Sequence, residues 1–167
     1  MLGIESCRFY HRNGVNFMEL KIPPLVQVLL FGSGMLFISK LFPLFILSIP
    51  SNIPIGILFA SIGVIAAFIG VIEFRKAKTT VDPRHLEKSE ALVTTGIYKI
   101  SRNPMYLGFL IILLGCFFIL ENIAALLLLP AFVLYINHFQ IKPEERFLLK
   151  KFGSNYSQYC SKVRRWA

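Results

Sequence analysis

The sequence lacks the compact motifs of the common soluble enzymes and of metal sites. It contains no glycine-rich dinucleotide or P-loop pattern, no HExxH helix and no GxSxG turn. Its three cysteines, Cys7, Cys116 and Cys160, are far apart, and its three histidines show no ligand spacing with one another or with the cysteines. The sequence therefore predicts neither a disulfide framework nor a metal site.

Acidic residues are almost missing from the four long apolar runs, which cover residues 22–42, 54–74, 104–120 and 123–141. The one acidic residue inside them, Glu73, stands next to the end of the second run. Ion pumps and transporters more often place acid–base groups in the middle of the membrane. The pattern therefore disfavours these two classes.

Apolar residues dominate what is present. Hydrophobic residues make up 55% of the 167 residues and charged residues 16%, more apolar surface than a soluble domain of this size can bury. The chain is therefore predicted to be an all-α integral membrane protein whose four apolar runs are transmembrane helices. Only Glu121 and Asn122 separate the last two runs, which are expected to form an antiparallel hairpin. An amphipathic cytoplasmic helix is expected to follow, beginning at Pro143 and ending at Gly153.

The positive charge is confined to three segments. Of 18 Lys and Arg residues, three lie in 1–21, seven in 75–102 and seven in 142–167, and the eighteenth is Lys40 at the end of the first run. The positive-inside rule then places both termini and the 75–102 loop in the cytoplasm. Anionic lipid headgroups account for the net charge of +9 better than nucleic acid, which is not an expected partner.

The domain organisation is predicted to be simple. Residues 1–21 form a polar N-terminal extension, and residues 22–167 form a single membrane domain. Met18 opens a compact lead-in to the first span, so we hypothesise that residues 1–17 are dispensable. The small size favours the inner membrane of a prokaryotic cell.

Polar chemistry is concentrated in residues 92–108, LVTTGIYKISRNPMYLG, where cations, hydroxyls and aromatics directly precede an apolar run. Polar groups at the mouth of a span are costly, so they indicate function. Glu144 and Glu145 begin the tail helix, where the helix dipole favours anions; alone they indicate only a capped interfacial helix. The hairpin, however, returns this helix start to the same membrane face as Arg102, which predicts a shared polar site.

These two blocks carry a family resemblance. GIYKISRNPMYLG, a helical hairpin and then EERFLLKKFGSNYSQYCSKVRRW resemble the isoprenylcysteine carboxyl methyltransferase family and the related phospholipid methyltransferases. The resemblance covers residues 92–166. It implies a membrane-embedded methyltransferase that uses S-adenosylmethionine without a soluble Rossmann fold. The acceptor would be a lipophilic or isoprenoid-type molecule from the bilayer that presents a carboxylate, thiol or amine.

The resemblance also implies site residues. Those with a catalytic role would be Arg102, Asn103, Glu145 and Arg164, and either Arg164 or its alternative Arg165 would lie near the substrate. Those that bind the cofactor would be Tyr98, Arg102, Pro104, Met105, Tyr106, Leu107, Gly108, His138, Glu144 and Glu145. Asn103 stands where the family pattern has histidine, and because asparagine cannot take up a proton near neutral pH, it is expected to position groups rather than act as a base.

Two other readings of the sequence stay open. One is a membrane NADPH-dependent reductase of the sterol-reductase type, whose C-terminal half carries a similar boundary motif. The other is a non-catalytic membrane scaffold with the same fold. A titration that compares S-adenosylmethionine with NADPH separates the three hypotheses, while the oligomeric state is left open by the sequence.

Overall fold

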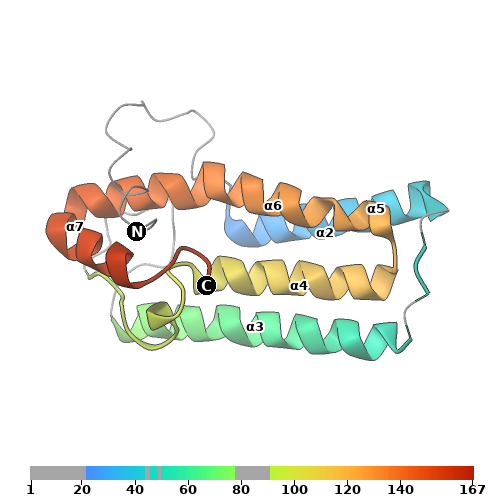
Figure 1. The fold of residues 1–167 in the computed structure, drawn as a ribbon, viewed down its shortest axis with the longest axis horizontal. Helices are drawn as coiled ribbons and strands as arrows, with labels where there is room; N and C mark the ends of the chain where they lie inside the picture. The colour runs from blue at the N-terminus through green and yellow to red at the C-terminus, as the bar shows by residue number, and fades with distance from the viewer. Residues whose placement is uncertain (1–21, 44–45, 49, 78–90) are drawn as a thin grey trace. The chain divides into compact units, whose positions relative to one another are not determined.

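The structure is a computed structural model that describes residues 22–43, 46–48, 50–77 and 91–167. This part of the chain is helical and contains no named strand. The elements in order are α2 (Pro24–Leu41), α3 (Asn52–Lys76), the 3₁₀ helix η3 (Gly96–Lys99), α4 (Pro104–Leu120), α5 (Ile123–Leu126), α6 (Leu128–Ile136), the π-helical turn η4 (Asn137–Ile141) and α7 (Lys142–Lys162) (Figure 1). The all-α fold is confirmed. The predicted extension, residues 1–21, lies outside the described residues.

Among the described residues, three helical runs are long and apolar enough to cross a membrane: α2, α3 and the continuous run from Ile123 to Lys162. α4 is apolar throughout but has 17 residues, a length of about 26 Å, slightly less than a typical hydrocarbon core. Its bounds are those predicted. Pro104 suits the first helical turn, where its missing N–H costs little, and Glu121 ends the helix with a φ of 51°. The protein is therefore an all-α membrane protein.

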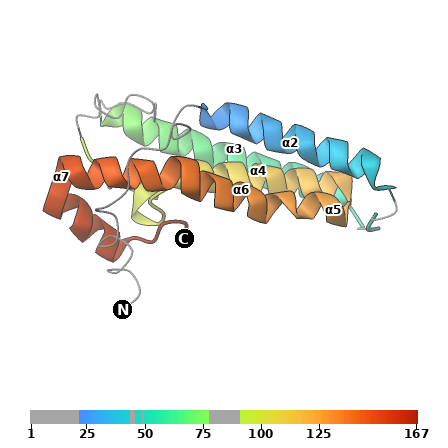
Figure 2. The ribbon, with the colours of Figure 1, turned by 90° about the horizontal axis from the view of Figure 1, so that it is seen from above.

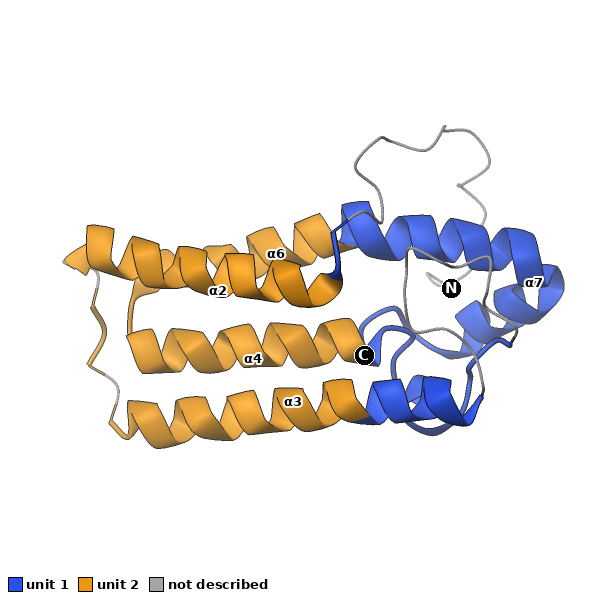
Figure 3. Ribbon diagram, turned by 180° about the vertical axis from the view of Figure 1, so that it is seen from behind, with its two compact units in different colours: residues 1–23, 69–104, 137–167 blue, residues 24–68, 105–136 orange. Residues whose placement is uncertain are grey.

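The described chain forms two compact units (Figure 3). Unit 1 contains residues 69–104 and 137–167 together with the chain up to Pro23, and unit 2 contains residues 24–68 and 105–136. α3 contributes residues to both units. The polar motif up to Pro104 and the whole tail belong to unit 1, so the candidate site can be described within that unit alone.

Unit 2 is held together by close approach of α3 and α4, which run side by side in Figure 1. A Cβ added to Gly63 would lie 2.5 Å from the carbonyl oxygen of Gly108, and a Cβ on Gly108 would lie 2.5 Å from that of Gly63. Gly56 and Gly115 repeat this contact two turns away. Because lipid provides no hydrophobic drive between helices, such close backbone packing is the main source of their attraction.

The turn between α4 and α5 is tied by the fully buried side chain of Asn122. Its oxygen accepts a hydrogen bond from the Ala125 N–H at 3.1 Å, which caps α5, and its nitrogen donates to the Phe42 carbonyl at 2.9 Å. α2 packs against α5 and α6, and the Phe31 and Phe132 rings lie 5.3 Å apart. The predicted tight turn at Glu121 and Asn122 is confirmed.

The first part of the tail helix stops at Gly153, as predicted. The φ of 51° and ψ of −120° at Gly153 are not helical, and a second helical part, which was not predicted, follows to Lys162, the last residue of α7 (Figure 2). The second half turns back and packs Tyr156, Tyr159 and Cys160 in a cluster with partly buried apolar side chains that include Leu148. The chain changes direction at Gly153, and the apolar residues after it pack against apolar residues that precede it in the same helix.

Candidate active site

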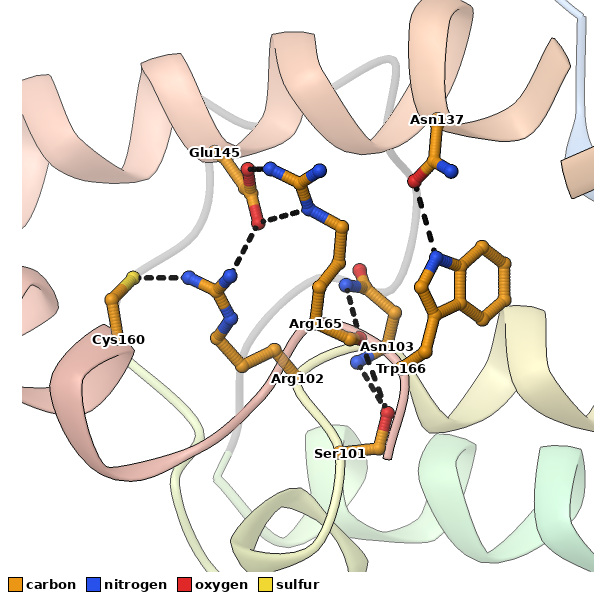
Figure 4. A network of polar contacts seen from close by, with 8 residues as sticks. All are labelled: Ser101, Arg102, Asn103, Asn137, Glu145, Cys160, Arg165 and Trp166. Carbon is orange, nitrogen blue, oxygen red and sulfur yellow. Dashed lines mark hydrogen bonds and ion pairs between the residues drawn. The ribbon is translucent and has the colours of Figure 1, made fainter. Parts of the chain in front are cut away.

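The end of the tail lies along the polar motif. Ser101 and Arg164 form an isolated parallel bridge, and the Arg102 N–H donates to the Arg164 carbonyl at 3.0 Å. The next carbonyl, that of Arg165, accepts from the Ser101 hydroxyl at 3.3 Å and from the Asn103 side-chain amide at 3.0 Å (Figure 4). Residues some sixty positions apart are thus joined by both backbone and side chains.

The centre of the site is an ionic cluster on the carboxylate of Glu145. Arg165 grips it through Nε at 3.1 Å and Nη2 at 2.6 Å, and Nη2 of Arg102 approaches at 3.1 Å (Figure 4). The side chains of Glu145 and Arg102 are only 11% and 7% exposed. Two-point arginine–carboxylate contacts are geometrically specific as well as strong. Removing one partner of such a buried cluster costs about 3–5 kcal/mol, because the remaining charge is left unpaired.

The cluster holds charges of both signs. Two guanidinium groups, of Arg102 and Arg165, approach the Glu145 carboxylate, and Nη1 of Arg102 also donates to the sulfur of Cys160. In a poorly hydrated setting each of these charges attracts a ligand group of opposite sign more strongly than it would in water. The cluster therefore offers guanidinium groups that can bind a carboxylate and a carboxylate that can bind an amine or a hydroxyl.

The last residues of the chain are fixed at a second point. The Trp166 indole N–H donates to the side-chain oxygen of Asn137 at 3.2 Å (Figure 4). Asn137 begins the π-helical turn η4, which precedes α7 without a break. Single π turns inside α-helices are frequent at functional sites, and this one places an amide opposite the chain end.

Tyr98 supports the cluster from the 3₁₀ helix η3. Its ring is 5% exposed and meets Phe74 edge-on at 5.4 Å, while its carbonyl accepts from the Tyr159 hydroxyl at 2.6 Å. Burial, and next the negative charge of Glu144, raise the pKa of Tyr98 far above its ordinary value. The Tyr98 hydroxyl is therefore a neutral group at physiological pH.

Glu73 holds the start of the motif. Its carboxylate accepts from the Thr95 hydroxyl at 2.8 Å and from Lys76 at 2.9 Å. Gly96 follows with a φ of 56°, and a Cβ there would lie 2.6 Å from the Glu73 carboxyl carbon. The glycine of the GIY motif is thus required twice, by the positive φ and by the contact with Glu73.

A comparison with known protein families identifies the family of this chain. The model of the phospholipid methyltransferase family matches residues 51–155, well over half of the chain. The chain belongs to the phospholipid methyltransferase family. The match extends from α3 to the start of the second half of α7, so it includes Arg102 and Glu145.

Named relatives agree with the family. A probable protein-S-isoprenylcysteine O-methyltransferase of Oryza sativa subsp. indica is 33% identical over 112 residues, 65% of this chain and 57% of that protein. A protein-S-isoprenylcysteine O-methyltransferase of Schizosaccharomyces pombe is 40% identical over 76 residues, 46% of this chain and 32% of that protein. An uncharacterized protein of Haemophilus influenzae is 50% identical over 62 residues, 98% of its length. The chain thus spans only part of the named methyltransferases, and no solved structure matches it.

The residues expected to form the site in this phospholipid methyltransferase family member fall into three groups. Arg102 and Glu145 form an ion pair, and Asn103 donates to the backbone carbonyl of Arg165. Tyr98 accepts from Tyr159, and Glu144 is near enough to Tyr98 to raise its pKa. Arg164 is exposed and contributes its carbonyl, while Arg165 supplies the side chain that grips Glu145. Side chains of consecutive residues in an extended segment point to opposite sides. This explains why the Arg165 side chain reaches Glu145 while that of Arg164 is exposed.

The remaining expected residues have other surroundings. The ring of His138 packs against Phe139 at a centroid distance of 4.7 Å, and Pro104 is fully buried at the start of α4. The other four belong to unit 2, where the Tyr106 ring lies 6.4 Å from Phe109 and Gly108 is a helix-packing residue. These four expected cofactor residues are Met105, Tyr106, Leu107 and Gly108, and their role stays a prediction.

Sequence reasoning missed several residues of the site. Arg165 was named only as an alternative to Arg164, and Ser101, Cys160 and Trp166 were given no role. Glu73 had a usable signal, because a carboxylate inside an apolar run needs a partner. Within the described residues, no three His, Cys, Asp or Glu side chains gather as metal ligands would.

Proposed function

We propose that this protein is an integral membrane methyltransferase that takes a methyl group from S-adenosylmethionine and transfers it to a lipophilic acceptor. The observation that carries the proposal is the Arg102–Glu145–Arg165 cluster, because it joins the two sequence blocks that the family resemblance rests on. A scaffold would not need two guanidinium groups desolvated around one carboxylate at the end of an apolar helix, since that arrangement is costly to bury.

The cluster fits the chemistry of this cofactor. S-adenosylmethionine, when bound, supplies a methyl group on a positively charged sulfonium sulfur. Arg102 and Arg165 match its carboxylate, and Glu145 or Glu144 matches an amine or a ribose hydroxyl. Every one of these groups lies in unit 1. The protein's part in the reaction is to hold both partners in line, because methyl transfer needs positioning more than covalent help.

The acceptor is proposed to be lipophilic. The relatives of Oryza sativa and Schizosaccharomyces pombe are named as enzymes of protein-S-isoprenylcysteine, and the spans of this chain expose large apolar side chains along α2 and α3. Transfer to a carboxylate or thiolate annihilates opposite charges, which a poorly hydrated site favours. A prenylated cysteine carboxylate therefore leads the acceptor series, followed by a phospholipid amine and an isoprenoid thiol.

The proposal is tested by titrating the purified full chain in lipid nanodiscs with S-adenosylmethionine and, separately, with NADPH. We expect saturable binding of S-adenosylmethionine. The variant Arg102→Lys should bind at least tenfold more weakly, because lysine keeps the charge but loses the planar two-point grip. The exposed Lys150→Gln is the matched control for a change of one cation on α7, and it should bind as the wild type does.

Two results would contradict the proposal. Saturable binding of NADPH without binding of S-adenosylmethionine would favour the reductase reading. Binding of neither would favour a scaffold. Arg102→Lys leaves Glu145 paired with Arg165, and thermal unfolding of the variant in the same nanodiscs distinguishes a loss of binding from a loss of the fold.

A further inference from the structure

The side chain of Asn103 contacts the chain's own tail. Its amide nitrogen donates to the Arg165 carbonyl at 3.0 Å, and its backbone N–H donates to the Ser101 hydroxyl at 3.1 Å. That hydroxyl donates in turn to the same Arg165 carbonyl at 3.3 Å. Figure 4 shows the two side chains converging on this oxygen from the motif. A carbonyl oxygen has two lone pairs, so the two donors complete its hydrogen bonding.

These bonds fix the backbone on both sides of Arg165. The peptide before it is held through the Arg164 carbonyl by the Arg102 N–H, and the peptide after it is held through its own carbonyl by Asn103 and Ser101. When both flanking peptide planes are fixed, φ and ψ of the residue between them are fixed too. The direction of the Arg165 side chain is then set, and it leads to Glu145 at 2.6 Å.

We infer that Asn103 is a positioning residue: it seats the segment Val163–Trp166 on the motif and so aims the Arg165 guanidinium at Glu145. The effect of Asn103 on cofactor binding rests on the proposed function, whereas its role in holding the segment Val163–Trp166 does not. It also explains why asparagine works at this position, since the task needs a hydrogen-bond donor and no proton transfer. The role predicted for Asn103 in catalysis is then indirect: Asn103 acts by positioning the side chain of Arg165.

A tryptophan within the chain can report how the segment Val163–Trp166 is held on the motif. Trp166 is its single tryptophan, and it follows directly after Arg165 with its indole bound to Asn137. Fluorescence excited selectively in tryptophan, quenched by acrylamide, therefore reports how tightly the segment Val163–Trp166 is held. This reading needs neither cofactor nor acceptor.

The first arm compares Trp166 quenching in the full-length wild type, Asn103→Asp and Ser161→Ala. Aspartate keeps the shape of asparagine but places an acceptor against the Arg165 carbonyl, so we expect a clearly larger quenching constant. Ser161 is the matched control because its hydroxyl bonds the Gln158 carbonyl within α7, at 2.8 Å, away from the seat. Unchanged quenching in Asn103→Asp would overturn the inference.

The second arm is a double-mutant cycle in the affinity for S-adenosylmethionine, using Asn103→Asp, Arg165→Ala and the double variant. Loss of one hydrogen bond corresponds to about a two- to tenfold change. We expect Asn103→Asp to weaken binding by that factor in the wild type and to have almost no further effect in the Arg165→Ala background. Equal factors in both backgrounds would mean that Asn103 acts on the ligand directly, and would overturn the inference.

The two arms separate this inference from the proposed function. If the wild type does not bind S-adenosylmethionine, the proposed function fails, while the quenching arm still decides whether Asn103 holds the tail. If the wild type binds and the cycle shows no coupling between Asn103 and Arg165, the proposed function stands and the inference fails.

Discussion

At the scale of single residues, Glu145 is the side chain on which two arginines converge. It lies between Arg102 and Arg165 and is almost fully buried. Burying three charges is not in itself a good way to stabilise a protein, because their desolvation offsets most of their attraction. Such a cluster is therefore better explained by its chemistry than by stability, although breaking it is still costly.

The first prediction concerns that cost. Glu145→Gln leaves two guanidinium groups facing one another without a carboxylate, so the free energy of unfolding should fall by about 3–5 kcal/mol. Thermal unfolding in detergent measures the change. The exposed Lys150→Gln should shift it by less than about 0.5 kcal/mol. Equal shifts in the two variants would show that Glu145 is not held as described.

The second prediction separates the two reasons for glycine at position 96. Gly96 and Gly153 have similar positive φ values, 56° and 51°, but an added Cβ would meet Glu73 only at Gly96 and nothing within 4 Å at Gly153. Backbone strain alone costs roughly 1–3 kcal/mol. Gly96→Ala should therefore destabilise the protein more than Gly153→Ala in the same unfolding assay. A larger loss at Gly153 would contradict the account of the Glu73 contact.

At the scale of elements, α3 and α4 approach each other closely at two pairs of glycines in unit 2. Their contact depends on glycines placed where the other helix's backbone passes. Gly32 on α2 is different, because a Cβ there would have its nearest neighbour at 3.9 Å, an ordinary contact. The two kinds of glycine should respond oppositely to the same substitution.

The third prediction follows from this difference. Gly63→Ala places a Cβ 2.5 Å from the Gly108 carbonyl oxygen and should destabilise the protein by roughly 1–3 kcal/mol through overpacking. Gly32→Ala should be neutral or slightly stabilising, because alanine favours helix. Resistance to unfolding in detergent ranks the variants. Equal stability of the two would contradict the close α3–α4 packing.

The helices were predictable to different degrees, for physical reasons. α4 was predicted at its true bounds because Asn103-Pro104 and Glu121-Asn122 are strong local signals. The stop at Gly153 within α7 was predicted, but the second helical part up to Lys162 was not, since a local stop signal carries no information about the apolar surface on which a further helix can pack. The approach of Ser101 and Asn103 to Arg165 was beyond prediction, because it joins atoms over sixty residues apart through a backbone carbonyl.

At the scale of the whole molecule, the distribution of apolar and charged residues indicates how the chain lies in a bilayer. α2 buries only Gln27 and Met35 and exposes large apolar side chains such as Leu29 and Phe37. Soluble monomers rarely expose contiguous apolar surface of this kind. Lipid is the partner that such helices require, and the basic residues of α2 and α3 stand in their last turns, at Lys40 and at Arg75 and Lys76.

The fourth prediction is the orientation. Because cytoplasmic loops carry an excess of Lys and Arg, a fluorescent reporter that folds only in the cytoplasm should be active when fused after Ala167. A reporter active only outside the cytoplasm should work when inserted at Ser51, in the connection without basic residues. The reverse pattern of activity would contradict the cytoplasmic placement of the site.

The overall class and the meeting of Arg102 with Glu145 were predictable, because hydropathy and two sequence blocks determine them. That Arg165 and not Arg164 pairs with Glu145 was not, since it depends on how the segment Val163–Trp166 is held on the motif. The central claim joins these levels: the cluster around Glu145 serves methyl transfer at the membrane.

The most direct test is transfer of an isotope-labelled methyl group from S-adenosylmethionine into the organic-solvent extract of membranes that contain the protein and a prenylated cysteine acceptor. The account predicts label in the extract with the wild type and with Lys150→Gln, and at least a tenfold loss with Arg102→Lys. No label with the wild type across carboxylate, amine and thiol acceptors, or full labelling with Arg102→Lys, would contradict it.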